Sequence, residues 1–235
     1  MPHAAPPRVV IVPGWRDSGP GHWQSLWAEQ LPGAVRVVQD DWISPARAAW
    51  VESLRRTILD LPGPVVVAAH SLGCIAVTHL PADALARIRG ALLVAPADPE
   101  RKAVLADFAP VPHARLPFRS VLVASGNDPF CPVRLAGAYA RAWGSEFVRL
   151  QDAGHINLES GFGPWPLGRA LLRSLTEDGD EAGRDGDSEQ DDSVPEEEDT
   201  VASIDRIPAR PSGAAPQRAR ALPAPPLRRT AEVRR

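Results

Sequence analysis

The chain has 235 residues, of which 44% are hydrophobic and 23% charged, and its formal net charge is −3. It contains no run of about 18 apolar residues, so we expect no transmembrane helix and no membrane partner. Two cysteines, Cys74 and Cys131, are too few for a disulfide framework or a zinc-finger spacing, and we expect free thiols. Because residues 1–8 hold no apolar stretch of signal-peptide length, the sequence predicts a cytoplasmic protein.

Charge is distributed unevenly along the chain. Residues 1–176 carry 17 basic and 14 acidic side chains, a mildly basic balance that indicates no nucleic-acid partner. Residues 177–235 carry 9 basic and 15 acidic side chains, with few large apolar residues to offset the entropy of ordering. We therefore expect one folded domain over residues 1–176 and a disordered tail over residues 177–235. Nothing in the composition of this tail identifies a partner.

Short apolar runs alternate with amphipathic stretches along the first 176 residues. The expected strands are Arg8–Val12, Val35–Gln39, Val65–Ala69, Ala91–Ala95, Ser120–Ser125 and Glu146–Leu150. The expected helices are His22–Gln30, Pro45–Leu59, Gly73–His79, Val133–Trp143 and Trp165–Ser174. Continuous apolar runs are typical of strands that helices cover on both faces. The alternation predicts an α/β fold with a mostly parallel, doubly wound sheet of about six strands.

The sharpest motif is the segment Ala69-His70-Ser71-Leu72-Gly73, which lies between an expected strand and an expected helix. A serine with a small residue two positions before and two after it predicts a nucleophile elbow in this context. The serine there adopts a strained backbone, and larger neighbours would collide with adjacent chain. Ser71 is therefore the predicted nucleophile, and the Leu72 N–H is a predicted oxyanion donor. The alternative is a serine that only caps the helix.

A serine hydroxyl needs a base to take its proton, and the base needs an acid to orient it. In the α/β-hydrolase arrangement the chain order is serine, acid, histidine. His155, after the last expected strand, is favoured as the base over His113. Asp128 follows the strand Ser120–Ser125 and is the favoured acid, while Asp98 holds the same place one strand earlier and stays open as the alternative. Ligand crevices form at these strand ends.

The first expected strand leads into a glycine-rich loop over residues 13–23. The Trp15 N–H is a predicted second oxyanion donor. Trp15, His22 and Trp165 are candidates to line a substrate pocket, with plain loop packing as the alternative for the tryptophans. The loop resembles a dinucleotide-binding motif only in part, because Gln24 stands where a third glycine is needed. Three further tryptophans are expected in the core: Trp23, Trp27 and Trp50.

At these residues the chain resembles the small retinoblastoma-binding-protein-nine-like (YdeN-like) serine hydrolase family of the α/β-hydrolase superfamily. The matching motifs are Val12-Pro13-Gly14-Trp15, His22-Trp23-Gln24-Ser25, Trp42-Ile43-Ser44-Pro45, His70-Ser71-Leu72-Gly73, Ala95-Pro96-Ala97-Asp98, Ser125-Gly126-Asn127-Asp128-Pro129 and Gly154-His155-Ile156-Asn157. The resemblance covers about residues 8–175 and implies a minimal hydrolase sheet, a triad of Ser71, Asp128 and His155, and esterase-like activity. The tail has no counterpart in the pattern.

Together the motifs predict a serine hydrolase that uses no metal or organic cofactor. Its expected partner is a small acyl substrate, an ester, thioester or amide, cleaved through an acyl-serine intermediate. About 50 residues separate Ser71 from the strand before Asp128, and they must also complete another strand, so no large lid is expected. The alternative is a binding or scaffold protein that keeps the same fold without the chemistry.

Overall fold

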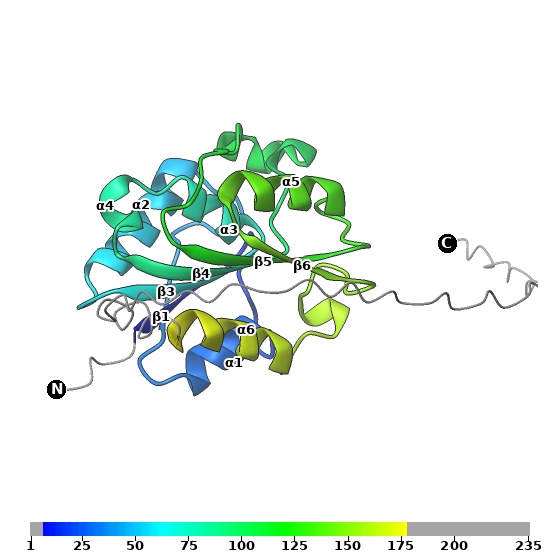
Figure 1. Cartoon of the computed structure of the whole chain (residues 1–235). Helices are drawn as coiled ribbons and strands as arrows, with labels where there is room; N and C mark the ends of the chain where they lie inside the picture. Colours follow the sequence, from blue (N-terminus) through cyan, green and yellow to red (C-terminus); the bar gives the residue numbers. More distant parts are fainter. Residues whose placement is uncertain (1–6, 178–235) are drawn as a thin grey trace, which may run out of the picture. The chain divides into compact units, whose positions relative to one another are not determined.

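Six parallel strands form one sheet in the computed structural model, which describes residues 7–177 (Figure 1). The strands are β1 (Arg8–Val12), β2 (Val35–Arg36), β3 (Val65–His70), β4 (Ile88–Val94), β5 (Arg119–Ser125) and β6 (Glu146–Leu150). Their order is β2-β1-β3-β4-β5-β6, and every neighbouring pair is parallel, which confirms the predicted α/β class. The strand order reverses between β1 and β3, where such sheets open a crevice at their carboxyl ends. The predicted tail lies outside the described residues, apart from Glu177.

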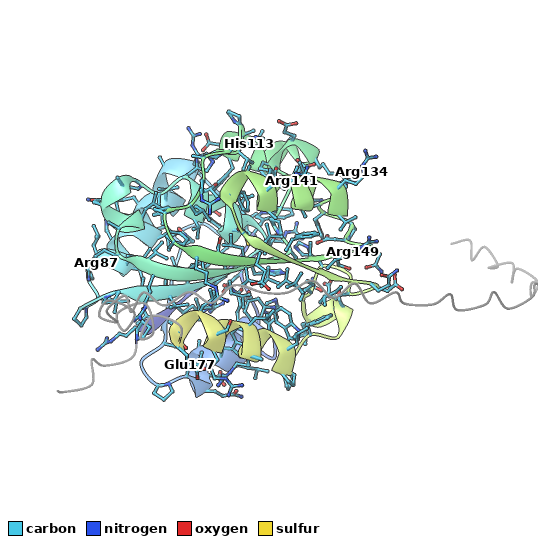
Figure 2. The ribbon with its side chains drawn as sticks, viewed as in Figure 1. Arg87, His113, Arg134, Arg141, Arg149 and Glu177 are labelled. Atoms are coloured by element: carbon cyan, nitrogen blue, oxygen red, sulfur yellow. The ribbon has the colours of Figure 1, made fainter. Side chains whose placement is uncertain are left out.

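Helices cover both faces of the sheet, as the apolar strands predict (Figure 1). On one face lie α1 (Trp23–Gln30) and α6 (Pro166–Glu177). On the other lie α2 (Arg47–Leu59), α3 (Leu72–Thr78), the short α4 (Ala82–Leu85) and α5 (Val133–Trp143), from which Arg134 and Arg141 point outward (Figure 2). Three 3₁₀ turns complete the described chain: η1 (Pro99–Arg101), η2 (Ala103–Phe108) and η3 (Leu158–Ser160). Only η1 and η2 lie between β4 and β5, so no large lid is inserted there.

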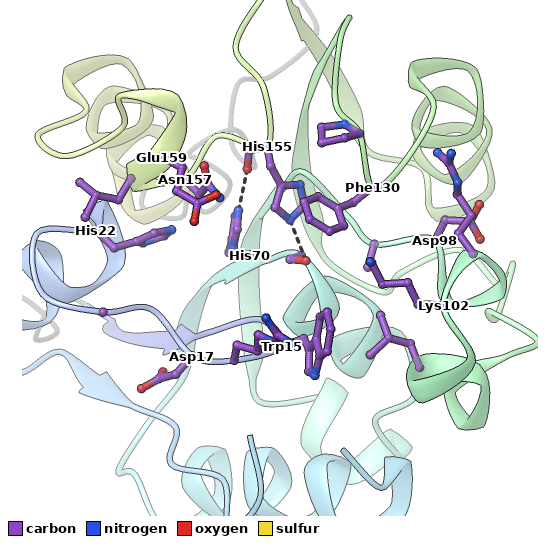
Figure 3. Close-up of a pocket in the computed structure, with 18 residues that line it drawn as sticks. Trp15, Asp17, His22, His70, Asp98, Lys102, Phe130, His155, Asn157 and Glu159 are labelled. Atoms are coloured by element: carbon purple, nitrogen blue, oxygen red, sulfur yellow. Dashed lines mark hydrogen bonds between the residues drawn. The ribbon is translucent and has the colours of Figure 1, made fainter. Parts of the chain in front are cut away.

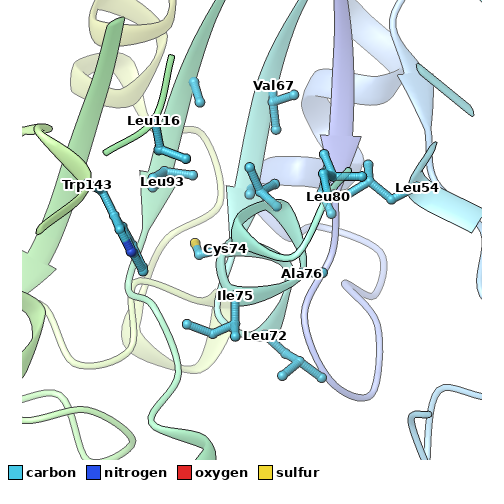
Figure 4. Packing of buried hydrophobic residues seen from close by; sticks show 14 of the residues in the cluster. Leu54, Val67, Leu72, Cys74, Ile75, Ala76, Leu80, Leu93, Leu116 and Trp143 are labelled. Atoms are coloured by element: carbon cyan, nitrogen blue, oxygen red, sulfur yellow. The ribbon is translucent and has the colours of Figure 1, made fainter. Parts of the chain in front are cut away.

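Alternate residues of each strand supply two separate cores, one on each face of the sheet. On β1, Val10 and Val12 face α2 and α3, whereas Val9 and Ile11 face α1 and α6. The larger core surrounds α3, with the free and buried thiol of Cys74 inside it (Figure 4). Each large apolar side chain buried this way stabilises the fold by about 1.5–3 kcal/mol relative to exposure.

Tryptophan rings fill the smaller core. Trp23 and Trp27 of α1 are 0% and 1% exposed, and their ring centroids lie 4.6 Å apart. Trp165, which directly precedes α6, stacks on Trp27 with a centroid distance of 6.1 Å. Trp50, 1% exposed, lies in the larger core. The expected core positions of Trp23, Trp27 and Trp50 are therefore confirmed.

Several predicted boundaries differ from the structure by one to three residues; for example, β4 begins at Ile88 and α6 continues to Glu177. Two other differences have a visible cause. The helix expected from Pro45 begins at Arg47, because the Asp41 carboxylate accepts the backbone N–H groups of Ile43 and Ser44 and holds the preceding segment in a turn. The strand expected over Val35–Gln39 ends at Arg36. It lies at the edge of the sheet, and only β1 pairs with it, so few of its backbone groups find ladder partners.

Candidate active site

Ser71 occupies the turn between β3 and α3, at the carboxyl end of the central strands. Its backbone has φ 54° and ψ −121°, a strained conformation that side-chain-bearing residues rarely adopt. A Cβ at Gly73 would lie 2.5 Å from the Val12 carbonyl oxygen, and a Cβ at Gly14 would lie 2.7 Å from Ser71 Cβ. The elbow therefore requires glycine at both positions, and the loop after β1 lies directly against the serine.

His155 connects Ser71 to Asp128 (Figure 3 draws the bond to the serine). Its Nε2 atom lies 2.9 Å from Ser71 Oγ, and its Nδ1 atom lies 2.9 and 3.0 Å from the two Asp128 carboxylate oxygens. An ionised carboxylate can only accept, so Nδ1 carries the ring proton and Nε2 accepts from the serine hydroxyl. The His155 and Asp128 side chains are 8% and 2% exposed, which limits the competition from water.

The alternatives from the sequence, Asp98 and His113, have other partners. The Asp98 carboxylate accepts the Glu100 N–H and caps η1, and both Asp128 oxygens occupy the nitrogen of His155 that Asp98 would need. His113 is exposed and its ring contacts Tyr139 of α5. Neither residue joins the hydrogen-bonded chain that runs from the serine to the carboxylate.

The loop that carries His155 is fastened to the end of β5. Asn127 Oδ1 accepts the Ser125 hydroxyl and the Gly154 N–H, both at 2.7 Å. Because Asn127 precedes Asp128 and Gly154 precedes His155, these bonds fix the spacing of the acid and the imidazole. No role was predicted for Ser125 or Asn127 from the sequence, although the polar run directly after a buried strand was the available signal.

His70, at the end of β3, holds the same loop by a hydrogen bond. It is buried, with 5% of its surface exposed, and its Nε2–H donates to the His155 carbonyl oxygen at 2.9 Å. Burial, followed by the neighbouring His155 and His22 rings, holds the pKa of His70 well below its usual value, so its ring stays neutral. The Trp23 indole N–H donates to the carbonyl oxygen of Ile156, the next residue, at 3.0 Å. From the sequence His70 was only a neighbour of Ser71, and no local pattern indicated this contact.

His22 caps α1 and lies beside His70. Its Nδ1 atom accepts the Gln24 N–H at 3.1 Å, and the two imidazole centroids are 5.1 Å apart. Burial, then the charge of Arg36 and then His155 lower the pKa of His22 to about 4. A neutral ring with Nδ1 as the acceptor carries its proton on Nε2.

A cavity of about 720 Å³ opens above the serine. Trp15 and His22 line it together with Ser71, and so does Phe130, whose ring centroid lies 4.4 Å from that of His155 (Figure 3). Trp165 does not line it: the side chain is 6% exposed and packs in the smaller core, so its predicted place in the pocket is wrong. Its ring contacts Trp23 and Trp27 of α1, which places it in that core and away from the cavity.

Two backbone N–H groups border Ser71. Leu72 follows it directly, and Trp15 follows Gly14, which touches it. Within residues 7–177 neither N–H donates to a protein acceptor.

Among the described residues, no helix is long and apolar enough to cross a membrane. Nor do those residues include a group of three or more His, Cys, Asp or Glu side chains placed to hold a metal ion.

The chain was compared with known proteins. The family model described as serine hydrolase matches residues 9–174. A YdeN-like hydrolase structure from Pectobacterium atrosepticum is 35% identical, with 72% of this chain and 93% of that chain covered and a TM-score of 0.65. The ydeN product of B. subtilis is 22% identical, with 72% and 98% covered and a TM-score of 0.60.

A thermophilic esterase from Thermogutta terrifontis shares the fold at 16% identity, with 72% of this chain and 90% of that chain covered and a TM-score of 0.54. No curated protein matches the chain. The family match spans nearly all of the described residues, and the Pectobacterium protein is similar over almost its whole length. The chain therefore belongs to the YdeN-like serine hydrolases of the α/β-hydrolase superfamily.

Proposed function

We propose that this hydrolase cleaves small esters, thioesters or amides through an acyl-serine intermediate. Ser71 is the nucleophile, His155 the general base and Asp128 the acid that orients it. The observation that carries the proposal is the hydrogen-bonded chain in which His155 Nε2 lies 2.9 Å from Ser71 Oγ while its Nδ1 contacts the Asp128 carboxylate. This arrangement activates a hydroxyl that is otherwise a weak nucleophile.

In the first half of the reaction, His155 Nε2 takes the hydroxyl proton as Ser71 Oγ attacks the substrate carbonyl. The Asp128 carboxylate stabilises the imidazolium that forms. Collapse of the tetrahedral intermediate breaks the bond to the leaving group, which receives the proton from Nε2. In the second half, water gives a proton to Nε2 and attacks the acyl-serine, and the acid product leaves as Ser71 regains its proton.

The Leu72 and Trp15 N–H groups are the proposed oxyanion donors. Both border Ser71, and neither has a partner within the described residues. One such donor contributes on the order of 100–1000-fold in rate. Because the groups are backbone, their position depends on the elbow and on the close approach of Gly14, not on a mobile side chain.

The cavity favours a small acyl partner. Its volume of about 720 Å³ is in the range of small-molecule sites, and its wall is made of loops after the strands together with the short turns η1, η2 and η3. No inserted cap between β4 and β5 covers it, so little apolar surface is available to bury a long lipid chain. A cytoplasmic location remains a prediction from the sequence.

The test compares the wild type with Ser71→Ala in hydrolysis of p-nitrophenyl acetate and in labelling by a fluorophosphonate. We expect Ser71→Ala to lower kcat/KM by at least roughly 10³-fold and to abolish labelling. Its thermal unfolding should match the wild type. Ser53→Ala on α2, at a residue that does not line the cavity, is the control and should keep both activities. Labelling of Ser71→Ala, or an unlabelled wild type, would refute the acyl-serine mechanism and favour a binding protein.

A further inference from the structure

The chain has one lysine, Lys102, and the structure places it in the wall of the Ser71 cavity. Lys102 joins η1 to η2 and is half-buried. Its Nζ atom lies 5.2 Å from the centroid of the Phe130 ring and 5.6 Å from that of Trp15 (Figure 3). Two aromatic faces therefore hold the ammonium group by cation–π attraction at the edge of the cavity.

These two rings also flank the reacting atoms. Phe130 packs against the His155 ring, with centroids 4.4 Å apart. Trp15 follows Gly14, which lies against Ser71. The positive charge of Lys102 therefore lies beside Trp15 and Phe130, the two rings that a substrate must contact when its carbonyl reaches the serine.

Within residues 7–177, no carboxylate lies within the 4.0 Å of an ion pair with Lys102. The acidic side chains around the cavity either bond to other groups or lie on the wall opposite Lys102. Asp17 pairs with Arg36, and Asp98 caps η1. Glu159 lies on the opposite wall, near His22 (Figure 3). An ammonium held by aromatic rings and left without a protein anion is suited to pair with an anion from the substrate.

The other charged side chains around the cavity determine on which side an anionic group of the substrate is favoured. Arg16 and Arg101 are exposed at its rim and raise the local concentration of anions. Glu159 repels a carboxylate from the wall near His22, whereas the charge of Asp17 is compensated by Arg36. Asp98 lies on the same side as Lys102, and its carboxylate caps η1. An anionic group is therefore favoured on the Lys102 side and disfavoured on the His22 side.

We propose that Lys102 binds a carboxylate of the substrate, so that the preferred substrates are short acyl compounds with a free carboxylate, such as half-esters of dicarboxylic acids. This inference rests on the proposed function, because Ser71 performs the cleavage. Lys102 selects the substrate and takes no part in proton transfer.

The test uses matched pairs of substrates that differ only in one charge. The first pair is mono-p-nitrophenyl glutarate and its methyl ester, with the charge on the acyl side. The second is 4-acetoxybenzoate and its methyl ester, with the charge on the leaving group. For the wild type we expect kcat/KM to favour the charged member of at least one pair by about tenfold, the effect of one charge-assisted hydrogen bond. The preference should shrink at high salt.

Variants at position 102 assign the preference to its charge. In Lys102→Gln the ratio of charged to neutral substrate should fall close to one, whereas Lys102→Arg should retain most of it. Arg141→Gln removes a charge from the outer surface of α5 and should leave the ratio at the wild-type value (Figure 2). Thermal unfolding of each variant confirms that it is folded. An unchanged ratio in Lys102→Gln would overturn the inference.

A binding measurement separates this inference from the proposed function. Glutarate should raise the unfolding temperature of Ser71→Ala and should do so less in the double variant Ser71→Ala/Lys102→Gln. Equal hydrolysis of charged and neutral esters by a Ser71-dependent wild type would refute carboxylate selection and leave the hydrolase mechanism standing. Equal stabilisation of the single and double variants by glutarate would refute it independently of turnover.

Discussion

The two sides of the site are built in different ways. The serine side is fixed by steric contacts of neighbouring chain: Gly73 lies against the Val12 carbonyl, and Gly14 against Ser71 itself. The histidine side is fixed by hydrogen bonds from distant residues, since His70 is 85 positions from His155 and Trp23 is 133 from Ile156. The elbow is therefore intolerant of added atoms, whereas the histidine loop is sensitive to lost donors.

The largest effect is expected from Asp128→Asn, which replaces the carboxylate that accepts the hydrogen bond from His155 Nδ1. An amide can donate to Nδ1 and stabilise the wrong tautomer of His155, so that Nε2 no longer accepts from Ser71. We expect kcat on p-nitrophenyl acetate to fall by about 10³–10⁴-fold with little loss of stability. Asp152→Asn, an exposed change in the same loop, is the control and should retain activity. Full activity of Asp128→Asn would exclude Asp128 as the acid.

Gly73→Ala tests the steric side. The new Cβ would lie 2.5 Å from the Val12 carbonyl oxygen and 2.7 Å from the Pro13 carbonyl oxygen, and backbone cannot yield as a side chain does. We expect a loss of at least about 3 kcal/mol in the free energy of unfolding, measured in urea, together with lost fluorophosphonate labelling.

Gly137→Ala on α5 is the matched control for this change. The nearest atoms to its Cβ are those of Phe147 at 3.9 Å, so the added methyl group meets only ordinary contact. Alanine also favours a helix more than glycine does, by roughly 1 kcal/mol. If both substitutions had the same effect on stability, the elbow would not be sterically fixed in the way proposed.

The buried histidines make stability depend on pH. His22 has a pKa of about 4 in the fold, below that of an unfolded chain, so the unfolded state binds more protons between these values. The free energy of unfolding should therefore fall as the pH drops from about 6.5 towards 4, by roughly 2–3 kcal/mol from His22. His70, whose pKa is also lowered, acts in the same direction.

Urea unfolding between pH 7 and pH 4 measures this dependence. His22→Asn keeps a side chain that can cap α1 and should reduce the slope. The control, His113→Asn, changes an exposed histidine and should retain the wild-type slope. A wild-type protein whose stability does not change over this range would show that the histidines are not held neutral by burial.

The serine side of the site could be predicted from the sequence, whereas most of the contacts on the histidine side could not. Ser71 is recognisable because the steric demands of the elbow act within five residues of sequence, and strand ends limit the candidates for the acid. His70 and Asn127 were not recognised as supports of the His155 loop, because their partners are identified only when the sheet brings β3, β5 and β6 together. Trp165 was misplaced for the same reason: its neighbours on α1 are distant in sequence.

The smallest effect, and the sharpest distinction between packing and positioning, is expected from Trp23→Phe. Trp23 donates its indole N–H to the carbonyl of Ile156, which has φ 49° next to His155. Trp27 packs in the same aromatic core, and no hydrogen bond from its indole occurs among the described residues, so Trp27→Phe removes a similar volume without touching the loop. Both variants should lose stability, with about 1 kcal/mol more for the lost donor in Trp23→Phe.

The two variants should differ in turnover. Only Trp23→Phe releases the segment after His155, so we expect it to lower kcat on p-nitrophenyl acetate several-fold while Trp27→Phe keeps kcat near the wild-type value. If both variants lose activity in proportion to their stability, Trp23 contributes only to packing. If Trp23→Phe alone loses kcat, the loop is positioned by a hydrogen bond from α1, and the contrast with the sterically fixed elbow holds.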